Sequence, residues 1–248
     1  MNQKDSNQKE PFIQFKRVVK KFAGAGGEFT ALRGIDLVIA QGEYVGITGK
    51  SGSGKTTLLN MLTGIDRPTS GEIVVDRRMV HSLNESRMAV WRGRNVGIVF
   101  QFFQLLPTLT IIENVMLPMD LAGYLHYPAR KKRAAVLLEK MGILEQANKL
   151  PPALSGGEQQ RAAIARALAN DPPIIAADEP TGNLDSATAE MVFGILDGLV
   201  VEGKTVILIT HDREVSKRVQ RCITLSDGKI INDTGGMKAA STGGGEVV

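Results

Sequence analysis

Residues 43–56 read Glu-Tyr-Val-Gly-Ile-Thr-Gly-Lys-Ser-Gly-Ser-Gly-Lys-Thr, a short apolar run followed by a glycine-rich loop. The loop, Gly49–Thr56, has the spacing G-x-x-x-x-G-K-(S/T) and lies between an expected strand and an expected helix, the context that this motif requires. Glycines let the backbone turn tightly, so its N–H groups converge on a bound anion, and the positive end of the following helix points to the same place. The stretch therefore predicts a phosphate-binding loop that opens an α/β domain.

Each position of this loop has an expected role in binding ATP. Lys55 is expected to reach the β- and γ-phosphates, and the hydroxyl of Thr56 to ligate Mg²⁺. A chance match should arise in roughly one chain of this length in a hundred, and the flanking strand and helix make chance rarer still. The expected ATP-binding residues of the loop are Gly49, Lys50, Ser51, Gly52, Ser53, Gly54, Lys55, Thr56 and Thr57.

Two adjacent carboxylates follow the apolar run 174–177, Ile-Ile-Ala-Ala. Small and apolar residues throughout are typical of a strand buried in a parallel sheet, and ligands bind at the carboxyl edge of such a sheet. We therefore expect Asp178 to help hold Mg²⁺ and Glu179 to polarise the water that attacks the γ-phosphate. Two solvated acids at a strand end are the alternative, which the phosphate-binding loop disfavours.

A second glycine turn precedes a helix at residues 154–161, Leu-Ser-Gly-Gly-Glu-Gln-Gln-Arg. It predicts another anion site at a helix N-terminus, and one nucleotide does not need two such sites from one chain. Two chains placed head to tail would hold each γ-phosphate between the loop of one and the Ser-Gly turn of the other. Ser155 and Glu158 also have the spacing of a capping box, an ordinary helix start, and both interpretations can hold together.

With these motifs in this order, residues 12–233 resemble the ATP-binding cassette (ABC) ATPases. The resemblance implies that Gln101 is the Q-loop residue that links Mg²⁺ and water to a transmembrane partner, and that Asp185 lies in the D-loop at a dimer interface. It implies that His211 is the switch residue at the γ-phosphate. Phe22 resembles the aromatic residue that stacks on adenine, with a plain hydrophobic edge as the alternative. The signature residues expected to contact ATP across the dimer are Ser155, Gly156, Gly157 and Glu158.

Strand-like and helix-like segments alternate along the chain and predict an α/β fold. With the resemblance, this is a P-loop NTPase (RecA-like) core with an N-terminal antiparallel β subdomain and a helical subdomain carrying the signature. Prolines 107, 118, 128, 151 and 152 are expected to separate the pieces of the helical subdomain, about residues 102–168, inserted in the core. The cassette is expected to span 12–234, with a polar disordered N-terminus (1–11) and a flexible tail (235–248). Strands are expected at 12–15, 34–39, 43–48, 71–76, 95–100, 174–177, 205–209 and 222–225, and helices at 56–62, 162–168 and 187–199.

The composition is that of a folded, mildly basic protein. The 248 residues are 43% hydrophobic and 23% charged, with 30 Lys and Arg against 26 Asp and Glu. No apolar run reaches the roughly 18 residues of a membrane span, one cysteine excludes an internal disulfide, and the polar N-terminus carries no secretion signal. We therefore expect a cytoplasmic protein, and the resemblance implies that a membrane partner holds it peripherally at the inner face of the cell membrane. The basic run 130–133 is expected to be a solvated helix face rather than a nucleic-acid patch, so no nucleic-acid partner is expected.

The stretches 106–110, 154–158 and 181–185 look like those of the lipoprotein-release, macrolide-export and cell-division ATPases. Glu158 departs from the glutamine of the broad signature, as is frequent in this subgroup. The resemblance implies an ATPase that forms a homodimer on ATP and drives a separate transmembrane permease subunit, docked near Gln101, in export or force transmission. One alternative is an ATPase that regulates a cell-wall enzyme through a membrane partner. Another is an ABC ATPase acting on nucleic acid, but residues 55–155 hold neither the heptads nor the Cys/His cluster of that class.

Overall fold

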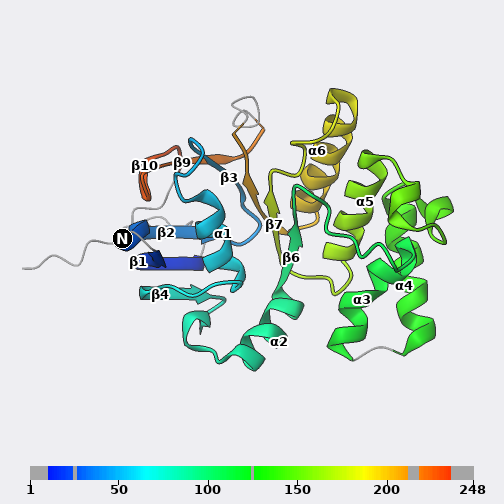
Figure 1. The fold of residues 1–248 in the computed structure, drawn as a ribbon, viewed down its shortest axis with the longest axis horizontal. Coiled ribbons are helices and arrows are strands. Elements are labelled where there is room, and N and C mark those ends of the chain that lie inside the picture. The colour runs from blue at the N-terminus through cyan, green and yellow to red at the C-terminus, as the bar shows by residue number, and fades with distance from the viewer. Residues whose placement is uncertain (1–10, 25–26, 124–125, 212–217, 236–248) are drawn as a thin grey trace, which may run out of the picture.

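Two β-sheets with a helix between them form one side of the molecule, and helices α3 to α6 lie on the other (Figure 1). The computed structural model describes residues 11–24, 27–123, 126–211 and 218–235. The first sheet, in the order β2-β1-β4-β5, is antiparallel throughout. The second, in the order β10-β9-β3-β8-β7-β6, is parallel except for the edge strand β10. The strands are β1 (Pro11–Gly24), β2 (Gly27–Ala40), β3 (Tyr44–Thr48), β4 (Ser70–Val75), β5 (Arg78–Met79), β6 (Val96–Val99), β7 (Ile174–Asp178), β8 (Thr205–Ile209), β9 (Arg221–Ser226) and β10 (Lys229–Asp233).

The parallel sheet is buried on both faces, which explains the unbroken apolar strands of the sequence. In β7, Ile174 and Ala176 face the core around helix α1 (Lys55–Thr63), whereas Ile175 and Ala177 face the core beneath the other helices. Because α1 lies between the two sheets, its Leu58 is completely buried. This placement fixes the N-terminus of α1, and with it the preceding glycine loop, at the carboxyl edge of the parallel sheet.

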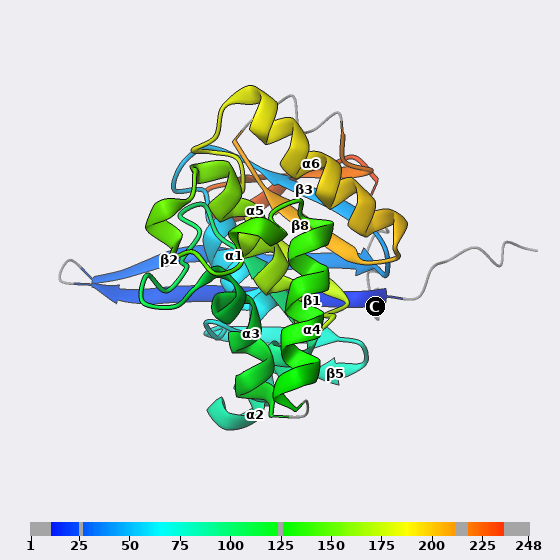
Figure 2. The ribbon, with the colours of Figure 1, turned by 90° about the vertical axis from the view of Figure 1, so that its right-hand side faces the viewer.

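The helices that follow β6 pack on one another and against the parallel sheet (Figure 2). They are α3 (Ile111–Ala122), α4 (Tyr127–Lys140), α5 (Gly156–Ala167) and α6 (Ser186–Val201). The basic run 130–133 lies on α4, whose opposite face buries Leu137 and Leu138, as the pattern predicts. Two of these cations have partners within the fold: Arg130 pairs with Asp120 at 2.6 Å, and Arg133 donates to the carbonyl of Ala169.

Pro118 does not separate two helical pieces, and the expectation that it does is wrong. It lies inside α3, where proline removes one backbone hydrogen bond at a cost of about 3 kcal/mol. The helix continues because its apolar face is buried, with Ile111, Val115 and Met119 fully enclosed. The amide of Asn170 also donates to the Pro118 carbonyl at 3.1 Å. By contrast, Pro128 is at the start of α4, a position that proline favours.

The observed elements extend beyond the expected ones, and some are new. The antiparallel strands β1 and β2 each continue past the runs 12–15 and 34–39, because irregular register breaks the alternation of their side chains. The sequence pattern did not predict α2 (Glu85–Asn95), β5 or β10. Pro11 begins β1, and the N–H of Gly235 donates to Asp233, so Pro11 and Gly235 are ordered. The other residues of the expected disordered ends, 1–10 and 236–248, lie outside the described residues. Within the described ranges, no helix is both long and apolar enough to cross a bilayer.

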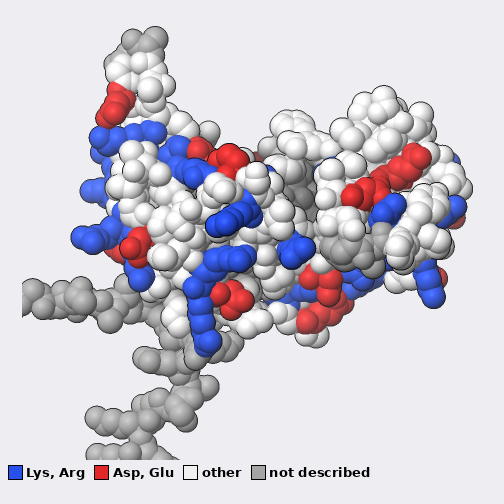
Figure 3. All heavy atoms as spheres, turned by 90° about the horizontal axis from the view of Figure 1, so that it is seen from below, with Lys and Arg blue, Asp and Glu red and all other residues white. Residues whose placement is uncertain are grey.

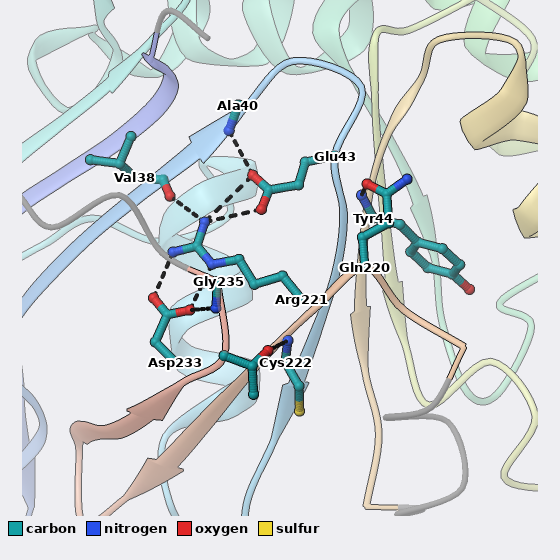
Figure 4. Close-up of polar contacts among 10 residues, drawn as sticks. Val38, Ala40, Glu43, Tyr44, Gln220, Arg221, Cys222, Asp233 and Gly235 are labelled. Atoms are coloured by element: carbon teal, nitrogen blue, oxygen red, sulfur yellow. Dashed lines mark hydrogen bonds and ion pairs between the residues drawn. The ribbon is translucent and has the colours of Figure 1, made fainter. Parts of the chain in front are cut away.

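A buried arginine joins the antiparallel sheet to the edge of the parallel sheet (Figure 4). Arg221, 4% exposed, donates to the carbonyl of Val38 at 2.7 Å and to both carboxylate oxygens of Asp233 at 2.6 and 2.7 Å. It also pairs with Glu43 at 3.1 Å. Burial lowers the pKa of Arg221, but its contacts with Asp233 and Glu43 more than offset this, so the net direction is upward. The guanidinium thus connects β2, β3, β9 and β10 through one fixed charge.

Candidate functional site

The glycine loop forms a closed turn at the N-terminus of α1. Gly49, Gly52 and Gly54 have positive φ angles of 150°, 76° and 104°. A Cβ at Gly54 would lie 2.7 Å from the carbonyl oxygen of Ala31, so the backbone itself excludes a larger residue there. Helix α1 has no side-chain cap and no acidic residue in its first turn. Its first N–H groups and its positive dipole end are therefore available to an anion.

Lys55 folds back over this loop. Its ammonium donates to the carbonyls of Gly49 and Lys50 at 2.9 and 3.0 Å, and the residue is 8% exposed. The loop therefore holds a buried positive charge whose hydrogen-bond partners are neutral carbonyls. The buried hydroxyl of Ser53 has no partner among the described residues. Both features fit a loop built to surround phosphate oxygens.

The expected metal-binding side chains from two distant segments meet at the loop. The Thr56 hydroxyl donates to Asp178 Oδ2 at 3.1 Å, although the two residues are 122 apart in sequence. Burial raises the pKa of the Asp178 carboxyl, the neighbouring charge of Glu179 also raises it, and Thr56 and Lys55 lower it. One hydroxyl and one carboxylate fit Mg²⁺, which takes few protein ligands and completes its octahedron with phosphates and water.

Glu179, the expected general base, directly follows β7 and faces His211. Its Oε1 lies 3.1 Å from Nδ1 of the histidine. Glu179 has a positive φ of 46°, an unfavourable conformation for a side chain of this size. Its backbone is held by hydrogen bonds to Ile209 on the next strand and from Gly182 in the next turn. The sheet edge thus imposes the strain that aims the carboxylate.

These residues line one hollow of about 520 Å³, which we call the nucleotide hollow. It brings together much of the glycine loop, Glu179, His211 and, at its rim, Phe22. A second aromatic residue, Phe29, lines the same rim, and the sequence analysis missed it. Phe22 and Phe29 are paired across strands β1 and β2, and their symmetric spacing about the glycine-rich stretch 24–27 of the sequence was the signal that could have found Phe29. Two partly exposed rings at the rim fit a planar base better than one.

Gln101 lies beside the nucleotide hollow and does not line it. A Cβ at Gly182 would lie 2.9 Å from the Gln101 side-chain nitrogen, and Asn183 donates to the Gln101 carbonyl at 3.3 Å. Gln101 therefore packs on the turn that follows Glu179. Its expected roles in catalysis and as a metal ligand stay predictions.

The Ser-Gly turn of the same chain is not part of the nucleotide hollow either. Ser155 and Glu158 form the capping box of α5: the Ser155 N–H donates to Glu158 at 2.8 Å, and the Glu158 N–H donates to Ser155 at 3.3 Å. The hydrogen bond from the Ser155 hydroxyl lowers the pKa of Glu158. Gly156 and Gly157 leave the front of the turn without side chains. The turn is a preformed helix start, and its contact with ATP stays a prediction.

Asp185, the expected D-loop residue, caps helix α6. Its carboxylate accepts from the Thr188 N–H at 3.0 Å and from the Thr188 hydroxyl at 2.6 Å, and these bonds lower its pKa. Helix α6 leaves no space for a side chain at Gly157 of the expected signature, because a Cβ there would lie 2.3 Å from Cγ2 of Thr188. The first turn of α5 and the first turn of α6, which Asp185 caps, are therefore in direct contact.

Residues 32–182 match the family model of the ABC transporter. The chain belongs to the ABC transporter family. This match contains the glycine loop, the signature turn and the Asp178–Glu179 pair, and it identifies the chain as an ABC ATPase cassette with an α/β P-loop NTPase fold.

Curated relatives and a solved structure support the assignment. The cassette is 44% identical to the lipoprotein-releasing system ATP-binding protein LolD of Hyphomonas neptunium, over 90% of this chain and 98% of that protein. It is also 44% identical to the macrolide export ATP-binding/permease protein MacB of the same organism, but it spans only 36% of that protein. The dimeric ATP-binding cassette MJ0796, solved in a post-hydrolysis state with ADP and Pi, has a TM-score of 0.84 and 42% identity over 89% of this chain and 97% of that one.

Proposed function

We propose that two copies of this cassette bind two ATP molecules between them, hydrolyse them and drive a membrane permease partner in export or force transmission. The observation that carries the proposal is the separation of two anion-binding turns in one chain. The nucleotide hollow contains the glycine loop, Glu179 and His211, but not the signature turn 155–158. A head-to-tail second copy supplies that turn to each hollow. The solved structure of MJ0796, a related cassette, is dimeric, which supports the pairing of two copies.

The residues of the hollow have distinct tasks in this proposal. Backbone N–H groups of the loop and Lys55 bind the phosphates, while Phe22 and Phe29 stack on the base. Thr56 and Asp178 would hold Mg²⁺, which would offset the negative charge of the phosphates. Glu179 accepts a proton from the attacking water, and His211 at 3.1 Å orients the carboxylate and contacts the γ-phosphate.

The proposed docking site for the permease is an apolar groove of about 680 Å³ between α2, β6 and the ends of α3 and α5. We call it the apolar groove; Val90, Ile98 and Leu121 are among the residues that line it. Two exposed apolar residues, Phe102 and Leu106, lie in the loop that follows Gln101. The groove also reaches Gln104, whose carbonyl accepts from Arg166 of α5. This loop begins at Gln101, which packs on the turn after Glu179. A partner bound in the groove therefore contacts a loop that leads to that turn. Docking here places the cassette on the inner face of the membrane.

The alternative of a cell-wall regulator uses the same hollow and the same groove, and it differs only in the membrane partner. No observation on the described residues favours the nucleic-acid alternative.

Complementation between two inactive variants tests the shared site. Lys55→Met disables the phosphate-binding loop of one copy, and Ser155→Arg blocks the signature turn of the other. Each variant alone is expected to lose ATPase activity, because both sites of its homodimer are damaged. An equimolar mixture is expected to regain activity, since one site of the mixed dimer then combines an intact loop with an intact signature. Circular dichroism and the melting temperature establish that both variants fold. A mixture as inactive as its components would refute the shared site.

A further inference from the structure

A second hollow, on the other side of α2 from the apolar groove, is surrounded by positive charge. It measures about 390 Å³ and lies between β5 and α2. Arg78 comes from β5, while Arg87 and Arg94 come from α2, and Ser86 and Asn95 also line it. Arg87 and Arg94 are seven residues apart, which is two helical turns, so they project from the same face of α2. We call this site the arginine hollow.

The three guanidinium groups have no anionic partner among the residues that the structure describes. Two other arginines in this part of the structure do have partners: Arg67 pairs with Glu85 at 2.8 Å, and Arg92 donates to the Gly64 carbonyl at 2.6 Å. Arg78, Arg87 and Arg94 are exposed and make no such contact with their guanidinium groups among the described residues. Like charges around one hollow repel one another unless an anion is bound between them.

Apolar side chains line the arginine hollow beside the charged ones. They are Leu83, the exposed Val90 and the buried Trp91. Guanidinium forks match the oxygens of a phosphate, and a hollow lined by three of them offers several donors to one such group. The space of about 390 Å³ leaves room for further atoms beside one phosphate. The lining therefore accommodates a phosphate ester.

The position of the hollow favours a phosphate at a membrane surface. Val90 and Arg94 line both the arginine hollow and the apolar groove, so the two sites share one edge. Seen from the side of α2, blue Lys and Arg side chains predominate over red ones on the half of the molecule that carries β4 and α2 (Figure 3). Exposed apolar side chains, Val90 and Met79, lie among these charges. Basic residues next to apolar ones are the composition of surfaces that meet anionic bilayers.

We propose that the arginine hollow binds the phosphate of an anionic phospholipid head group beside the docked partner. This rests on the proposed function in one respect, because it takes the face with the apolar groove as the face turned to the membrane. Each arginine near an anionic surface contributes about fivefold to membrane affinity. Lipid binding would orient the cassette for its partner before docking.

The test measures co-sedimentation of the full chain with vesicles of phosphatidylcholine, with and without phosphatidylglycerol. Wild type is expected to bind only vesicles with phosphatidylglycerol. The double variant Arg78→Gln/Arg87→Gln is expected to bind them about 25-fold more weakly, while its basal ATPase activity stays unchanged because neither residue lines the nucleotide hollow. The matched control Arg33→Gln/Lys229→Gln removes the same charge from β2 and β10, across the molecule from α2, and is expected to stay close to wild type (Figure 1).

Several outcomes overturn the proposal. It fails if wild type shows no preference for phosphatidylglycerol, or if the double variant and the control lose equal affinity. It also fails if the double variant keeps vesicle binding but loses stimulation by the membrane partner, since an acidic segment of the partner then occupies the hollow. Inorganic phosphate that shifts the amide resonance of Asn95 without any vesicle binding points to a free phosphate ligand. None of these results bears on the complementation of Lys55→Met by Ser155→Arg, so the two proposals fail separately.

Discussion

The contact between the first turns of α5 and α6 makes the two expected signature glycines, Gly156 and Gly157, unequal. A Cβ at Gly157 would lie 2.3 Å from Cγ2 of Thr188, whereas a Cβ at Gly156 finds its nearest neighbours at 3.7 Å, an ordinary contact. Neither glycine has a positive φ angle, so alanine strains the backbone at neither position. Thr188 cannot rotate away freely, because its hydroxyl donates to Asp185 at 2.6 Å. We predict that Gly157→Ala destabilises the cassette and that Gly156→Ala does not.

The magnitude follows from two opposing effects. Replacing glycine by alanine at a helix position stabilises by roughly 0.5–1 kcal/mol, and this gain is common to Gly156→Ala and Gly157→Ala. Overpacking costs typically about 1–3 kcal/mol and applies to Gly157→Ala alone. The two variants should therefore differ by about 1–3 kcal/mol, which for a domain of this size is a difference of roughly 2–10 °C in melting temperature.

Thermal unfolding without nucleotide measures this difference in the absence of the ATP-bound dimer. Thr188→Ser removes the clashing methyl group and keeps the hydroxyl that Asp185 accepts, so it should restore most of the stability lost in Gly157→Ala. Thr188→Ser in the wild-type background is the control, with an expected cost below about 1 kcal/mol. Equal stability of the two alanine variants, or no rescue by Thr188→Ser, would refute the contact between Gly157 and Thr188.

Other predictions concern catalysis, stability, pH and docking. Glu179→Gln should lower ATP turnover by about 10²–10⁴-fold while ATP binding and the dimer persist, as measured by phosphate release and size exclusion, and near-normal turnover would remove Glu179 as the base. Arg221→Met should lower the free energy of unfolding, measured by urea denaturation, by about 3–5 kcal/mol, because it removes the buried guanidinium that pairs with Glu43 and Asp233; a smaller loss would show that water compensates these carboxylates. Burial raises the pKa of Asp178, so this carboxylate takes up a proton at a higher pH than an exposed aspartate does. The Mg²⁺-dependent affinity for ATP should therefore begin to fall at that higher pH on acidification, and Asp178→Asn should flatten the pH profile of the affinity. Leu121→Asp should leave basal turnover intact but abolish its stimulation by a co-purified membrane partner. The control Val201→Asp, outside the groove, should keep that stimulation; equal stimulation of the two variants would show that the partner docks elsewhere.

Elements whose core contacts repeat regularly were predictable from the sequence. The buried strands around 174–177 and 205–209 appear where their apolar runs lie, because both faces of a parallel strand are covered. Helix α2 was not predicted, since most of its residues are polar, charged or glycine and it buries only Met88 and Trp91. Pro118 was misinterpreted because a local rule about proline cannot take into account the burial of the whole helix.

The site was predictable as a set of residues but not as an arrangement. The sequence named the glycine loop, Asp178, Glu179 and His211, and the structure places these together at one sheet edge. Phe29 was missed because its role depends on the register of the β1–β2 hairpin, which pairs it with Phe22. The arginine hollow was also out of reach, because β5 and α2 are brought together by packing rather than by any motif.

The sequence by itself determined which residues of this protein can bind a phosphate, and the tertiary structure decided where those residues lie relative to one another. Motif spacing specifies which backbone groups and side chains meet a phosphate, because a glycine loop and a helix start are local structures. Only the fold shows that Gln101 packs on the turn after Glu179, and that Phe29 lines the nucleotide hollow together with Phe22. These relations depend on how sheets and helices distant in sequence pack together, and no local pattern encodes such distances.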